Sequence, residues 1–157
     1  MMTRGKKAYI VISWILVAIC MGIIFSLSAQ TADDSAELSG SFILALLEWL
    51  GVELEQEVIR TIAHCLEFMG LALLIFNATY STWETKLTPV IAFAGTVFYA
   101  ITDEIHQIFV PGRAFQLTDI LVDSTGALVG VVVTFILLKI ILYIKERGNK
   151  NGSIETI

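Results

Sequence analysis

The sequence predicts an all-α membrane protein with four transmembrane helices and an additional outer interfacial helix between spans one and two. The 157 residues are 56% hydrophobic and have a mean hydropathy of +0.79, which is more apolar surface than a soluble domain of this length can hide in one core. Four apolar runs are each long enough to cross a hydrocarbon layer, which takes about 20 helical residues. These runs are residues 8–28, 59–80, 87–109 and 117–144. The sequence shows no internal repeat and no second, soluble domain. Residues 1–157 are therefore expected to form a single membrane domain.

The first apolar run resembles a secretory signal peptide in its flanking residues. It follows Arg4, Lys6 and Lys7, and it ends in small residues such as Ala29. Its apolar stretch of about 20 residues is longer than the roughly 7 to 15 residues of a signal-peptide core. We therefore predict a retained span, with cleavage as the alternative.

The connection between the first two runs contains a short apolar segment, SFILALLEWLG, at residues 41–51. About 11 residues are too few to span a membrane, and apolar side chains would cover one broad side of such a helix. Trp49 suits the depth of a membrane interface. We predict a helix lying at the outer interface, and a loop helix packed on the bundle is the alternative.

Small residues predict how the later runs are joined and packed. Residues 110–116 contain a Pro-Gly pair and are expected to form a tight connection. Gly126 and Gly130 lie four apart in the fourth run, a pattern that lets two helix backbones approach closely.

Cys20 and Cys65 lie in apolar runs, where a thiol acts as a small hydrophobe, so no disulfide is predicted.

The basic residues predict the orientation. Lys and Arg residues precede the first run, and others lie at or beyond the end of the fourth. Four spans would place both termini on one side, and the positive-inside rule makes that side the cytoplasm. The connection at residues 30–58 carries seven acidic residues and no Lys or Arg, so it is expected outside.

Polar residues collect at the outer ends of the second, third and fourth runs, at one expected membrane depth. They are His64 and Glu67 in the second run, Asp103, Glu104, His106 and Gln107 in the third, Arg113 in the connection, and Asp119 and Asp123 in the fourth. A charged residue at the middle of a membrane helix costs about 2.5 to 3.5 kcal/mol on insertion scales. Lipid-facing placement is therefore unfavourable, and we predict a polar cleft that opens at the outer face.

Several uses of this cleft are open. The histidines and arginines, Arg60 included, could neutralise the carboxylates in an ion-pair network that only assembles the helices. The arginines could bind an anionic headgroup. His64 or His106 could act as a general base. The His64-x-x-Glu67 spacing is a weak metal signal, because it lacks the His-Glu-x-x-His pattern of zinc enzymes, so no metal and no other cofactor is predicted.

The stretch DEIHQIFVPGRAFQLTDILVDSTGALVG, residues 103–130, resembles the signature of the VanZ-like family of small bacterial membrane proteins. FSLSAQ at residues 25–30 resembles the end of the first span in that family, and AHCLEF at residues 63–68 resembles its His-Phe-x-Glu-Tyr segment. Two departures concern the site. Asp123 stands where the family usually has Asn, and Thr61 stands where a basic residue is expected, with Arg60 displaced by one position.

The resemblance implies a multi-pass protein of the bacterial inner membrane, and the member after which the family is named is associated with low-level resistance to the glycopeptide teicoplanin. The function expected on this basis is engagement of an anionic or lipid-linked cell-envelope component, which would lower glycopeptide sensitivity. A membrane hydrolase or transferase acting on a lipid-linked substrate is one alternative, and a structural membrane module is another. Membrane lipids are the other expected partners, and no nucleic-acid partner is expected.

Overall fold

The computed structural model describes residues 2–30, 49 and 55–152. Its helices are α1 (Arg4–Ser28), α3 (Gln56–Trp83), α4 (Thr88–Gln107) and α5 (Leu117–Gly152), and no strand occurs in the described ranges. The all-α class is therefore confirmed. The interfacial helix predicted at residues 41–51 lies outside the described residues, apart from Trp49, which is exposed.

Within the described residues, three helices are long and apolar enough to cross a membrane: Arg4–Ser28, Val58–Trp83 and Leu117–Arg147. They indicate a membrane protein. The prediction of four spans is confirmed only in part, because α4, which covers most of residues 87–109, does not meet this criterion. Its buried side is polar at Thr88 and Thr96 and again at Asp103, Glu104 and Gln107, and these side chains lower the hydropathy of the helix.

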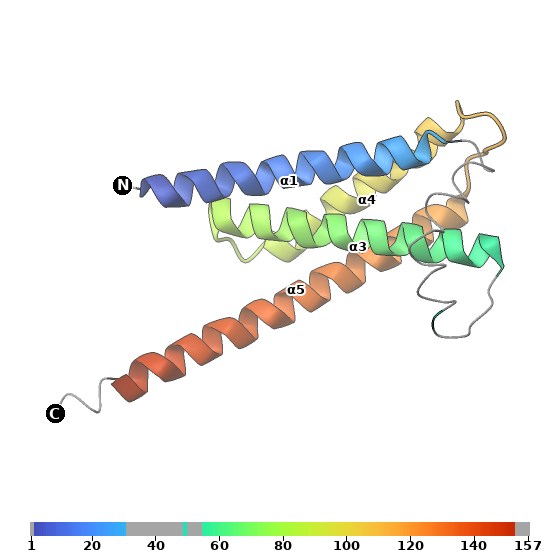
Figure 1. The fold of residues 1–157 in the computed structure, drawn as a ribbon. Coiled ribbons are helices and arrows are strands. Elements are labelled where there is room, and N and C mark those ends of the chain that lie inside the picture. The colour runs from blue at the N-terminus through green and yellow to red at the C-terminus, as the bar shows by residue number, and fades with distance from the viewer. Residues whose placement is uncertain (1, 31–48, 50–54, 153–157) are drawn as a thin grey trace.

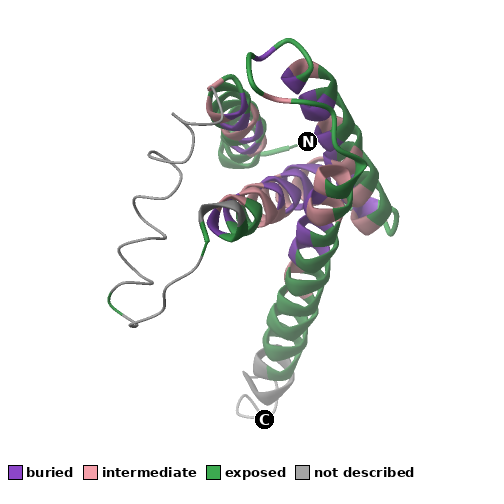
Figure 2. Cartoon of the chain, turned by 90° about the vertical axis from the view of Figure 1, so that its right-hand side faces the viewer, coloured by how far each residue is buried: buried purple, intermediate pink, exposed green. Residues whose placement is uncertain are grey.

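The helices form a bundle centred on α3, which packs against each of the other three described helices. Figure 1 shows both chain termini at one end of the bundle and the α4–α5 connection at the other. We call these the terminal end and the polar end. The helix α5 crosses α3 obliquely, and its C-terminal half diverges from the bundle. Burial is accordingly concentrated where the helices cross, and the later turns of α5 are exposed (Figure 2).

Two glycines of α5 set how closely it approaches α3. A Cβ added at Gly126 would collide with the backbone carbonyl of Cys65, and one added at Gly130 would lie 2.5 Å from the carbonyl oxygen of Met69. The predicted close approach at this glycine pair is confirmed. Cys20 and Cys65 are free cysteines in the structure.

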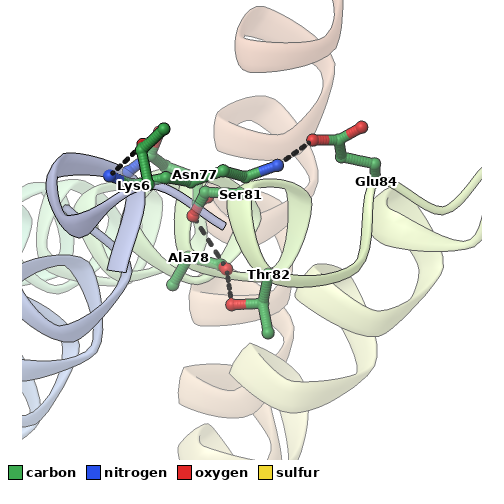
Figure 3. A network of polar contacts seen from close by, with 7 residues as sticks. Lys6, Asn77, Ala78, Ser81, Thr82 and Glu84 are labelled. Atoms are coloured by element: carbon green, nitrogen blue, oxygen red, sulfur yellow. Dashed lines mark hydrogen bonds and ion pairs between the residues drawn. The ribbon is translucent and has the colours of Figure 1, made fainter. Parts of the chain in front are cut away.

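At the terminal end, polar side chains join α1 to α3. The Tyr9 hydroxyl donates to Asn77 Oδ1 at 2.8 Å, and the Trp14 indole donates to Thr82 Oγ1 at 3.1 Å. Lys6 Nζ donates to Glu84 Oε1 at 2.6 Å, an exposed ion pair visible in Figure 3. Lys6 lowers the pKa of the Glu84 carboxyl through this hydrogen bond and through its charge.

Candidate functional site

The polar end brings together the last turn of α1, the first turns of α3, the last turns of α4 and the start of α5 (Figure 1). The connection between α4 and α5 turns sharply. Gly112 has a φ of 79°, a conformation that costs glycine little, and Arg113 N–H donates to the Val110 carbonyl at 3.1 Å. This confirms the tight connection predicted from the Pro-Gly pair.

Asp103 is the centre of a buried hydrogen-bond network. Its Oδ2 accepts from Ser28 Oγ of α1 at 2.7 Å and from Gln107 Nε2, one turn further along α4, at 3.1 Å. Its Oδ1 has no hydrogen-bond partner within the described part of the chain. The aspartate is 3% exposed, so this network ties α1 to α4 in a site that solvent barely reaches.

Glu104, the neighbouring residue, ties α4 to the connection that follows it. Its side chain is 1% exposed, and Oε2 accepts from the backbone N–H of Gln116 at 2.8 Å. Gln116 directly precedes α5, so this carboxylate satisfies a backbone donor at the helix start. This hydrogen bond holds the connection against the end of α4.

His64 of α3 and Asp123 of α5 face each other across the helix crossing. His64 Nδ1 lies 3.9 Å from Asp123 Oδ1, longer than a hydrogen bond, and neither atom has a hydrogen-bond partner among the residues described. They line a space of about 10 Å³ together with Arg60 and Asp119. That volume is comparable to one water molecule.

A larger pocket, of about 140 Å³, lies beside this space. Gln107, Arg113 and Gln116 line it from α4 and the connection, and Arg60 and Asp119 line both spaces. Burial, followed by the charge of Arg60, lowers the pKa of the Arg113 guanidinium from its ordinary value. Two guanidinium groups and a carboxylate thus share one small polar pocket.

The predicted site residues therefore fall into distinct places. His64, Asp119 and Asp123 surround the smaller space, and Gln107 and Arg113 line the larger one with Asp119.

The other predicted residues lie outside these two spaces. Asp103 and Glu104 are buried and line neither space. The His106 ring stacks on Phe25 of α1, with centroids 4.2 Å apart, and Glu67 lies half-buried on α3 without lining either space.

Arg60 was considered as a partner of the carboxylates or of an anionic headgroup, and the structure shows that it lines both spaces. Two other contributors, Ser28 and Gln116, were absent from the predicted set. Ser28 belongs to FSLSAQ, the segment at residues 25–30 that resembles the end of the family's first span, and that segment was a usable signal. Gln116 acts through its backbone N–H, which no side-chain pattern can reveal.

The site contains arginines that can bind an anion and a histidine and carboxylates that can transfer protons. In residues 2–30, 49 and 55–152, no three His, Cys, Asp or Glu side chains are grouped so that they could hold a metal ion.

The fold and the site define a helical membrane protein with buried carboxylates and two arginines gathered at one end of its bundle. A family model described as VanZ/LLP1 matches residues 13–139, which include every residue of that site. The chain belongs to this family. No curated protein and no solved structure matches it.

Proposed function

We propose that the polar end binds the anionic group of a cell-envelope component, at the outer face of the bacterial inner membrane. The observation that carries this proposal is the position of Arg60 and Arg113, which line the same 140 Å³ pocket. Guanidinium groups bind phosphate and carboxylate with paired hydrogen bonds.

The size of the pocket supports a particular kind of ligand. Pockets that enclose whole small molecules have volumes of about 300 to 1,000 Å³. A pocket of about 140 Å³ suits a single headgroup, such as a phosphate, carboxylate or sugar fragment, with the rest of the ligand outside. A lipid-linked precursor meets this requirement, because its lipid tail stays in the bilayer beside the helices.

The buried acids have a supporting role in this proposal. Asp119 lines the pocket with the two arginines, and in this proposal its charge orients them. Asp103 holds Gln107, whose side chain forms part of the pocket wall, through the 3.1 Å hydrogen bond. Engagement of a precursor in this way would lower sensitivity to glycopeptides such as teicoplanin. In this proposal both termini, which lie at the end opposite the pocket, face the cytoplasm.

The His64–Asp123 pair favours a second function, a membrane enzyme that acts on the same ligand. The imidazole lies 3.9 Å from the carboxylate, in a space that shares Arg60 and Asp119 with the anion pocket. His64 could then act as a general base oriented by Asp123. Turnover of a lipid-linked precursor by the reconstituted protein would support this reading, and binding without turnover would support the first.

The test replaces the arginines singly with glutamine, which removes the charge and keeps much of the side chain. Arg60→Gln and Arg113→Gln are expected to weaken binding to vesicles that contain a polyprenyl phosphate by at least tenfold, and to restore glycopeptide sensitivity in cells. Arg147→Gln, on the exposed part of α5, is the control and should change neither.

Membrane abundance must be measured in parallel with binding and drug sensitivity. Normal abundance with lost binding supports the anion pocket. Normal binding in both variants contradicts it, and loss of abundance alone favours a structural module instead.

A further inference from the structure

A third pocket, larger than the two at the polar end, lies near the terminal end, away from the candidate site. Its volume is about 370 Å³, and it is bounded by the end of α3, the start of α4 and the later turns of α5. Its lining is mostly apolar and includes Phe76, Tyr80, Pro89, Phe135, Leu138 and Leu142. Its lining residues on α5 belong to the half of that helix that diverges from the other helices (Figure 1).

Two lysines, Lys86 and Lys139, also line this pocket. Lys86 lies in the turn between α3 and α4. Lys139 belongs to α5, where its Nζ lies 5.4 Å from the centroid of the Phe135 ring. Both side chains belong to exposed residues, so their ammonium groups can meet a ligand that enters from outside.

The one acid of the lining is neutralised by a partner outside it. Glu84 Oε1 accepts a hydrogen bond from Lys6 Nζ of α1 at 2.6 Å (Figure 3). The pocket therefore presents a positive rim above an apolar interior. This combination is complementary to an amphiphile with an anionic head.

The positions of the two lysines along the chain point to a membrane lipid as the source of such a ligand. At 1.5 Å per residue, Lys139 lies roughly 33 Å along α5 from Leu117, close to the thickness of about 30 Å of a hydrocarbon core. Lys86 follows shortly after Trp83, the last residue of the second candidate span. The Trp83 and Trp14 rings meet edge to face at 6.0 Å, and tryptophans favour the membrane–water interface.

We propose that this pocket binds an anionic phospholipid of the leaflet on the side of the termini, with its phosphate between Lys86 and Lys139 and an acyl chain against Phe76, Phe135 and Leu142. Basic pockets between membrane helices are suited to lipid phosphates. The site is separate from the anion pocket at the polar end, and it does not depend on the function proposed above. Its occupant is a resident lipid that fills the opening left by the divergence of α5.

The test uses the full chain reconstituted in phosphatidylcholine vesicles, with spin-labelled phosphatidylglycerol and spin-labelled phosphatidylcholine as probes. The wild-type protein should prefer phosphatidylglycerol. Lys86→Gln/Lys139→Gln should reduce this preference at least fivefold, the effect typical of a single interfacial lysine. Lys145→Gln/Arg147→Gln, an equal charge change outside the pocket, should retain it.

A third variant separates the pocket from general surface charge. Leu142→Trp fills the apolar interior and keeps both lysines, so it should also reduce phosphatidylglycerol binding. Glycerol phosphate, which has the headgroup chemistry without acyl chains, should not compete with the lipid.

Three results would overturn the proposal. They are unchanged preference in the lysine variant, equal loss in the control pair, or unchanged binding in Leu142→Trp. Cross-linking of two chains through a cysteine at position 142, together with absence of bound lipid, would assign the pocket to a second copy of the chain instead. Helical content and Tm, measured for every variant, show that each one is folded.

Discussion

The two ends of the helix bundle use charged residues in opposite ways. At the polar end, Asp103, Glu104 and Asp123 are each at most 3% exposed. Asp103 and Glu104 accept hydrogen bonds, and Asp123 faces His64. At the terminal end, Lys6 and Glu84 pair on the surface, with side chains 45% and 61% exposed. A buried carboxylate without a donor is costly, whereas an exposed ion pair contributes little. Substitutions should therefore affect stability strongly at the polar end and weakly at the terminal end.

The largest effect is expected at the helix crossing that supports the polar end. Gly126→Ala should lower the free energy of unfolding by about 3 kcal/mol, at the upper end of the range for overpacking, because the new Cβ meets the Cys65 carbonyl. Gly22→Ala is the matched control, since a Cβ there meets nothing within 4 Å. Unfolding in detergent, followed by circular dichroism, measures both. Equal stability of the two variants would show that the crossing is not close-packed.

A smaller loss is expected in the buried network. Ser28→Ala removes one of the two donors to Asp103 Oδ2 and should cost about 2 kcal/mol, within the range for a hydrogen bond to a carboxylate. Ser26→Ala is the control, because that hydroxyl is exposed and donates only to the Gly22 carbonyl of its own helix. A cost as small as that of the control would mean that Asp103 is satisfied without Ser28.

The connection after α4 offers a still smaller effect. Glu104→Gln weakens the hydrogen bond from Gln116 N–H by removing the acceptor charge, at a cost of about 1 kcal/mol. Hydrogen exchange at residues 110–116 should become faster, while exchange in α1 stays unchanged. If hydrogen exchange at residues 110–116 does not become faster, Glu104 does not hold the connection in place.

The smallest effect, and one that depends on pH, is expected at Lys6 and Glu84. Lys6 lowers the folded-state pKa of Glu84, so the pair stabilises the fold above the unfolded carboxyl pKa of about 4.3, and this contribution is lost as pH falls through the lowered value. The Tm difference between the wild type and Glu84→Gln should be small at pH 7 and vanish in acid. High salt should reduce it, since exposed pairs are screened. A difference that grows in acid would contradict this assignment.

Much of the architecture could be predicted from residue order. Long apolar runs predicted α1, α3 and α5, and the Pro-Gly pair predicted the sharp connection. The glycine pair predicted the approach of α5 to α3. These features depend on local hydropathy or on backbone freedom, both of which are properties of short segments. The third run also formed a helix, α4, but it was expected to be a span although its polar residues, such as Thr88, Asp103 and Glu104, lower its hydropathy.

The sequence predicted which residues belong to the site better than it predicted how they contact one another. The polar residues at the run ends were identifiable because charge is rare in apolar helices. Which acid meets which donor was not identifiable. Asp103 and Glu104 are adjacent in sequence, yet one binds Ser28 of α1 and the other binds a backbone N–H before α5.

Residue order was enough to predict the helical class, the close approach at Gly126 and the concentration of polar residues at one end of the helices. The pockets became apparent from the three-dimensional arrangement, in which Arg60 and Arg113 line one pocket and Lys86 and Lys139 line another. Hydropathy and glycine act within a helix or at its immediate contact, whereas a pocket depends on the relative rotation and crossing of helices far apart in the chain.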